Sequence, residues 1–139
     1  MTKQLLSLFA ITLILTSCDP GFAVVLNNNS NKERNVTVSR VSKHELLEKD
    51  SIAISDTSQL DVLATRNRQK ILVAKDTLHN SYSFVLGSGK RALLDRDIGG
   101  PDIRQKIIID QHDTIALRRD KRTKIHRQFM YTLVSTTIQ

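Results

Sequence analysis

Cysteine is almost absent from this chain, whose 139 residues include only Cys18. A single cysteine excludes an intramolecular disulfide, so the folded part must be held together by a hydrophobic core. Internal repeats, coiled-coil heptads and low-complexity tracts are also missing, which excludes repeat and fibrous architectures. Residues 18–139 are enough for one domain, and a domain of that length buries on the order of two thirds of its unfolded surface.

Sequence motifs for catalysis and for metal binding are missing as well. No two histidines have the i, i+4 spacing of a helical metal site, and neither HExxH nor GxSxG occurs. The segment Gly87-Ser88-Gly89-Lys90 lacks the four-residue spacing and the final Ser or Thr of a phosphate-binding loop, so we interpret it as a hairpin turn. We therefore predict no enzyme activity, no cofactor and no metal, with a small secreted hydrolase or metal-dependent enzyme as the alternative. The four histidines are His44, His79, His112 and His126.

Acidic residues are outnumbered, with 14 Asp and Glu against 21 Lys and Arg. Only Lys3 of these charged residues precedes Cys18, so the excess of positive charge belongs to the rest of the chain. It is concentrated in one late segment, which we predict to contact an anionic envelope component; the structural alternative is a solvated hairpin tip that discourages aggregation. Aromatic residues are only 4% of the chain, and none lies within this cluster to stack on bases, so nucleic acid is not an expected partner. The cluster comprises Arg118, Arg119, Lys121, Arg122, Lys124 and Arg127.

The first eighteen residues have the organisation of an export signal. Lys3 gives a positive start, a largely apolar run follows from Leu5 to Leu15, and small residues lead to Cys18. The run is too short to span a bilayer, which takes about 20 apolar residues. Its ending, Leu15-Thr16-Ser17-Cys18, resembles the lipobox of bacterial lipoprotein precursors.

The resemblance to lipoprotein precursors implies that residues 1–17 are a signal peptide and that Cys18 carries fatty acyl chains such as palmitate. One acyl chain binds a membrane marginally, whereas two or three anchor a protein almost permanently. We therefore expect a lipid-anchored protein of the cell envelope, on the periplasmic face of the outer membrane. Asp19, directly after the cysteine, instead resembles the inner-membrane retention signal of enteric-type lipoproteins. Residues 18–21 would form the lipidated cysteine and a short linker.

From residue 22 onward, apolar residues alternate with polar ones or form short runs between turn residues, as in β-strands. Segment 22–26 and segment 34–41 are predicted to form an opening antiparallel pair, and 106–118 a hairpin around residues 111–113. Ser42 and Glu45 fit a capping box for one or two helical turns. Residues 60–66 fit either a strand or a short helix. Further strands are predicted at 52–54, 70–75, 82–86, 91–94 and 125–134.

This pattern predicts an all-β fold. We expect a small immunoglobulin-like antiparallel β-sandwich of about seven strands over residues 22–139, preceded by a signal helix. Sandwiches commonly bind through end loops or edge strands, so segments 95–104 and 118–127 are the candidate surfaces.

Three short segments match the Asp-Ser/Thr-aliphatic pattern on which some bacteria O-glycosylate exported proteins. They predict modification at Ser51, Thr77 and Thr114. Asp and Thr also favour turns that lead into strands, which explains each copy without glycosylation.

We interpret the protein as a non-catalytic, membrane-anchored binding or structural module of the envelope. Its expected partners are the membrane, through the lipid on Cys18, and an anionic envelope component or a protein. A subunit of a surface fibre or adhesin is the alternative; it would require an unpaired edge strand or an incomplete sandwich, and segment 125–138 is the place to inspect.

Overall fold

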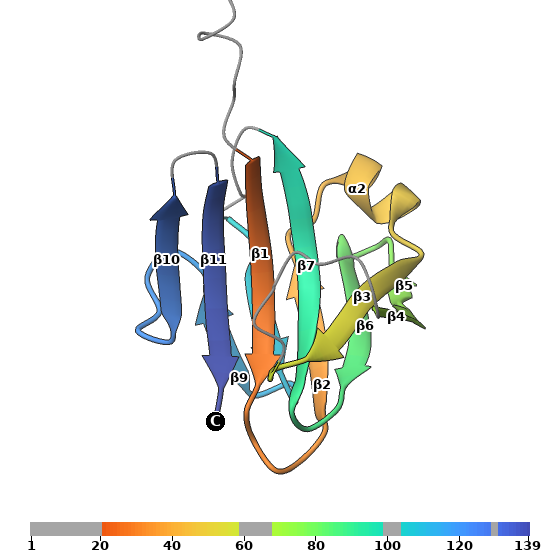
Figure 1. Ribbon diagram of the computed structural model, residues 1–139. Coiled ribbons are helices and arrows are strands. Elements are labelled where there is room, and N and C mark those ends of the chain that lie inside the picture. Colours follow the sequence, from red (N-terminus) through yellow and green to blue (C-terminus); the bar gives the residue numbers. More distant parts are fainter. Residues whose placement is uncertain (1–20, 59–67, 99–103, 129–130) are drawn as a thin grey trace, which may run out of the picture.

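The computed structural model describes residues 21–58, 68–98, 104–128 and 131–139. In these ranges the chain forms eleven strands and one short helix, and the strands form two facing sheets (Figure 1). The prediction of an all-β sandwich is confirmed, with more strands than expected. The predicted signal helix and the lipobox lie outside the described residues, as does segment 60–66.

The larger sheet has six strands and the smaller has five. In spatial order the first contains β10 (Thr123–Gln128), β11 (Tyr131–Ile138), β1 (Gly21–Asn28), β7 (Lys90–Ile98), β3 (Ser51–Asp56) and β4 (Gln69–Leu72). The second contains β5 (Ala74–Asp76), β6 (Ser81–Leu86), β2 (Arg34–Ser39), β8 (Lys106–Ile109) and β9 (Asp113–Ala116). The helix α2 (Lys43–Glu48) connects β2 to β3. Ser42 caps it by accepting a hydrogen bond from the Glu45 amide, as predicted.

The core lies between the sheets, and in the strands that form it buried apolar side chains alternate with more exposed ones. In β2 the side chains of Val36 and Val38 are fully buried, and in β8 Ile107 and Ile109 face the same layer. Successive strand side chains point to opposite faces, so one face of each strand supplies apolar surface to this layer. β1 differs because every residue from Phe22 to Asn28 is buried, so both faces of this strand are covered.

The pairing of the strands differs from the prediction in two ways. β1 and β2 are neighbours along the chain but belong to different sheets. β1 pairs instead with β7 and, in parallel, with β11, so the sandwich is not wholly antiparallel. A parallel pair needs a crossover connection, and here nearly the whole chain between residues 28 and 131 serves as that connection.

Two predicted strands are each divided in the structure. Segment 70–75 contributes β4 to one sheet and β5 to the other, with Val73 between them. Segment 125–134 contributes to both β10 and β11, which pair as a hairpin. Short apolar runs reveal strand character but not the point at which a chain changes sheet or direction. β7 also runs through Ile98, so the first half of the predicted loop 95–104 is strand; residues 99–103 lie outside the described part.

The sandwich has two distinct ends. β1 begins at the same end at which β2 finishes and α2 lies, and we call this the α2 end (Figure 1). At the other end, called the Asn28 end, the turn after β1 meets the end of β11, where the Asn29 amide donates to the Ile138 carbonyl (2.9 Å). One lateral side is bounded by β9 and β10, and the other is bounded by β4 and β5.

Candidate functional site

Residues 117–122 connect β9 of one sheet to β10 of the other and so cross one lateral side of the sandwich. The connection is held by backbone bonds. The amides of Arg119 and Asp120 both donate to the Ala116 carbonyl at 3.0 Å, and the Thr123 amide donates to the Asp120 carbonyl at 3.0 Å. This tight path places the predicted basic cluster along an edge rather than at a hairpin tip.

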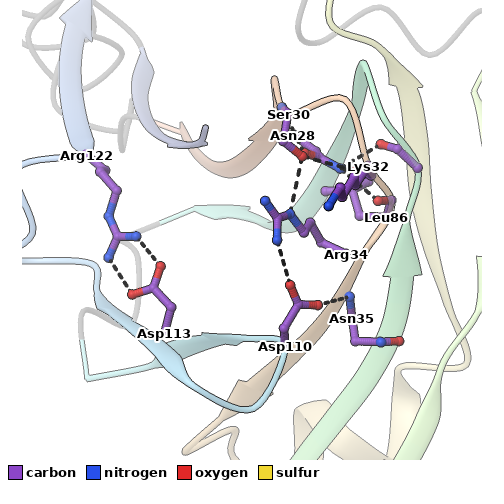
Figure 2. Close-up of polar contacts among 10 residues, drawn as sticks. Asn28, Ser30, Lys32, Arg34, Asn35, Leu86, Asp110, Asp113 and Arg122 are labelled. Carbon is purple, nitrogen blue, oxygen red and sulfur yellow. Dashed lines mark hydrogen bonds and ion pairs between the residues drawn. The ribbon is translucent and has the colours of Figure 1, made fainter.

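Arg122 holds the connection against β9. Its Nη2 donates to Asp120 (2.7 Å) and to Asp113 (3.1 Å), its Nε donates to Asp120 (2.9 Å), and its Nη1 also contacts Asp113. Figure 2 shows the paired contact between Arg122 and Asp113. The hydrogen bonds that Arg122 donates lower the pKa of Asp120, and the acceptance of these bonds by both carboxylates raises the pKa of Arg122. Arg122 therefore stabilises the fold, and the two carboxylates that it binds neutralise its charge.

The other five residues of the predicted cluster have no such partners. Asp113 and Asp120 both bind Arg122, and two carboxylates against six cations leave a net charge of +4 over residues 113–127. All five side chains are exposed, and within the described ranges none makes an ion pair or a side-chain hydrogen bond. We call this surface the basic edge. It comprises Arg118, Arg119, Lys121, Lys124 and Arg127.

The basic edge includes an outer strand of the larger sheet. The strand order ends at β10, so one side of its backbone has no paired strand among the described residues. Ile125 lies opposite Val134 on the inward face, yet 53% of it is exposed. Ile125 follows Lys124 and lies two residues before Arg127. This edge therefore has both apolar and cationic contact surface.

β11, by contrast, is paired on both sides, with β10 and with β1. Of segment 125–138, the part to inspect for a fibre or adhesin subunit, only β10 therefore has an unpaired edge among the described residues.

The Asn28 end contains a buried polar network that the sequence did not predict. Asn28 is fully buried, and its Nδ2 lies within 2.8–3.1 Å of the carbonyl oxygens of Lys32, Leu86 and Gly87. Its Oδ1 accepts hydrogen bonds from the amide and the hydroxyl of Ser30 (3.1 and 2.6 Å). These contacts join the turn after β1 to the turn after β6 (Figure 2).

A neighbouring ion pair extends this network into the smaller sheet, between the start of β2 and the end of β8. Arg34 donates to the Ser30 hydroxyl (3.2 Å) and to Asp110 (2.9 Å), and Asp110 also accepts from the Asn35 amide (2.9 Å). The hydrogen bond from Arg34 is the main cause of the lowered pKa of Asp110. A shallow depression of about 480 Å³ lies beside this pair and that of Arg122 with Asp113. Because a carboxylate binds each guanidinium that lines it, the depression offers little net charge to a ligand.

The remaining predicted positions are scattered. Ser51 begins β3 and is half-buried, whereas Thr77 in the β5–β6 turn and Thr114 in β9 are exposed. The four histidines are all exposed, and among the described residues no three His, Cys, Asp or Glu side chains gather as a metal site. Cys18 lies outside the described part. No helix in that part has the length and apolar character to cross a membrane.

A second polar cluster that the sequence did not predict lies beneath α2. Lys49 contacts the Leu94 carbonyl and lies 5.3 Å from the centre of the Tyr82 ring, and buried Gln105 donates to Glu45 (3.1 Å). The Tyr82 hydroxyl is buried without a hydrogen-bond partner among the described residues. Burial, followed by the charges of Glu45 and Asp95, raises the pKa of Tyr82, so the phenol stays neutral.

We expect Tyr82→Phe to raise the free energy of unfolding by about 1 kcal/mol, because a buried unsatisfied hydroxyl costs about 1–3 kcal/mol. Urea denaturation followed by circular dichroism measures this. A loss of stability would contradict the expectation and would mean that the hydroxyl is hydrogen-bonded in solution. The Tyr131 hydroxyl, at the start of β11, is likewise buried without a partner among the described residues, so Tyr131→Phe should also raise the free energy of unfolding and repeats the test outside this cluster.

Comparison with known proteins adds no family assignment: no family matches the chain, and no curated protein is similar to it.

Proposed function

We propose that this protein is a non-catalytic lipoprotein of the bacterial envelope, anchored through Cys18, whose basic edge binds an anionic envelope component. The observation that carries the proposal is the charge imbalance of the β9–β10 side. Arg122 binds both nearby carboxylates, and five exposed cations remain without partners in the described part of the chain. Such a surface attracts a polyanion and repels other cations.

The chemistry of the edge favours an extended anionic polymer over a small anion. The five cations lie along a connection and an edge strand rather than around a pocket. A small anion would require converging donors, whereas a linear polyanion can contact successive side chains. An acidic polysaccharide of the envelope has the required charge and shape.

Anchorage is tested on Cys18 itself. We expect the wild-type chain to incorporate radiolabelled fatty acid and to lose residues 1–17, and Cys18→Ala to do neither. Metabolic labelling with intact-mass spectrometry measures both, and Ser17→Ala, which keeps a small residue before the cysteine, is the control. An unlabelled wild-type chain would refute the anchor.

Binding is tested on residues 18–139 carrying Cys18→Ala, so that no lipid contributes. We expect this chain to bind isolated envelopes and to dissociate as salt rises, because exposed charges separated by more than about 10 Å are largely screened at 0.1 M. Lys121→Glu with Lys124→Glu should weaken binding at least about tenfold, equivalent to about 1.4 kcal/mol.

The matched control makes the same change of charge elsewhere. Lys32→Glu with Lys70→Glu reverses two exposed lysines, one in the turn after β1 and one in β4. Equal loss of binding in both double variants would show an effect of net charge alone. Binding that withstands salt and both double variants would refute the proposed role of the basic edge.

A further inference from the structure

The lipid proposed at Cys18 would restrict which end of the domain faces the membrane. Gly21 begins β1 at the α2 end, three residues after Cys18. A chain advances at most about 3.6 Å per residue, so Gly21 lies within about 11 Å of the lipidated residue. The Asn28 end, a full strand of eight residues away, lies about 24 Å further from the membrane at about 3.4 Å per residue. This step depends on the proposed anchor.

Two of the most exposed leucines in the described part of the chain lie at the α2 end. Leu47 in α2 is 73% exposed, and Leu78 in the β5–β6 turn is 83% exposed. The two segments are neighbours, because the Val41 amide before α2 donates to the Asn80 carbonyl of the turn (3.0 Å). Leu47, Lys43, Thr77 and Asn80 also line one depression of about 270 Å³. α2 turns Leu46 into the core, so it has one leucine on each face.

Two cations beside these leucines favour an anionic surface. Glu45 and Asp50 are neutralised by Lys49 (3.5 Å) and Lys75 (2.7 Å). Asp76 contacts His79 (2.7 Å) and Glu48 contacts His44 (3.5 Å), and a histidine balances a carboxylate only when it is protonated. Arg40, directly after β2, and Lys43, which begins α2, are exposed and make no ion pair or side-chain hydrogen bond in the described ranges. Exposed apolar side chains beside cations are typical of segments that bind the interface of anionic bilayers.

We infer that the α2 end is a membrane-docking surface, in which Leu47 and Leu78 insert into the lipid interface while Arg40 and Lys43 contact anionic headgroups. The occupant is the bilayer that holds the lipid anchor. The domain therefore stands upright on the membrane, and β1 runs from the membrane-facing α2 end toward the distant Asn28 end. In this orientation the basic edge lies on a lateral side of the domain, away from the membrane surface, and stays accessible to a polymer.

The test places an environment-sensitive fluorophore on single cysteines introduced into the full-length protein. Cys18 is acylated in this protein, so the new thiol is the one that reacts with the probe. Leu47→Cys and Leu78→Cys report on the α2 end, and Asn31→Cys, in the exposed turn at the Asn28 end, is the matched control. The labelled, lipidated proteins are reconstituted into vesicles of phosphatidylethanolamine and phosphatidylglycerol that contain brominated acyl chains.

We expect blue-shifted emission at positions 47 and 78 and quenching there at least about twofold greater than at position 31, since interfacial apolar groups sit about 5–10 Å into the headgroup boundary. Arg40→Glu with Lys43→Glu should reduce that quenching, and replacing phosphatidylglycerol by phosphatidylcholine should act in the same direction. Equal quenching at all three positions would overturn the docking.

The outcomes separate this inference from the anchor on which it rests. A protein that is acylated and floats with the vesicles, but leaves positions 47 and 78 unquenched, keeps the anchor and overturns the docking surface. The leucines would then be available to a protein partner instead. A wild-type chain without acylation would overturn both.

Discussion

Asn28→Ala is expected to lower the free energy of unfolding by about 3 kcal/mol. The side chain is fully buried and connects three carbonyl oxygens to the amide and hydroxyl of Ser30. Alanine would remove all five contacts and leave the Ser30 amide and the Leu86 carbonyl without the Asn28 partner, and a buried unsatisfied group costs about 1–3 kcal/mol. The Ser30 hydroxyl still donates to the Lys32 carbonyl (3.0 Å), and the Gly87 carbonyl still accepts from the Lys90 amide (3.2 Å). Urea denaturation monitored by circular dichroism measures the change.

Asn31→Ala is the control for this experiment. Asn31 is exposed in the same turn and makes no side-chain hydrogen bond among the described residues. The substitution should therefore change the free energy of unfolding by no more than about 0.5 kcal/mol. Similar values for Asn28→Ala and Asn31→Ala would contradict the structural role assigned to Asn28. Asn28→Asp should be at least as harmful as alanine, because it removes the amide donor and buries a charge.

The second large effect is expected in the core of the smaller sheet. Ile107→Ala should cost about 3 kcal/mol, within the range of about 2–5 kcal/mol for buried isoleucine truncations. Ile107 is fully buried in β8, where it faces Val38 of β2 and Ile115 of β9 in register. The cost combines lost apolar burial with the cavity left behind.

The adjacent residue provides a control with identical chemistry. Ile108 lies on the opposite face of β8 and is only half-buried, so Ile108→Ala should cost about 1 kcal/mol. The difference between the two variants measures which face of the strand belongs to the core. Equal losses would mean that the outer face of the smaller sheet is covered in the native protein.

Local pattern was sufficient to predict the fold class. Alternation in segment 34–41, the apolar run at 82–86 and the hairpin at 106–118 each gave a strand or a strand pair where the structure has one. The capping box at Ser42 was likewise specified by residues within one turn. These predictions succeeded because the physical cause and the sequence signal lie within a few residues of each other.

Predictions that depended on distant residues were wrong or missing. The strand predicted at 22–26 continues in the structure through Asn27 and Asn28. Distant partners stabilise these two side chains, because Asn27 donates to Ser135, 108 positions away, and Asn28 donates to the carbonyls of Leu86 and Gly87. In the basic cluster, Arg122 was grouped with its neighbours, because its partner Asp113 lies nine positions upstream with no regular spacing.

The parallel pairing of the first and last strands determines when this molecule can finish folding. β1 lies between β7 and β11, and Asn27 hydrogen-bonds Ser135 across 108 positions of sequence. Such high contact order slows folding, because a long loop must close before its contacts stabilise the chain. While a polypeptide is still being synthesised or threaded through a translocase, β1 lacks one of its two neighbours. The topology therefore keeps the larger sheet incomplete until β11 has emerged, and such a delay would suit the export proposed above.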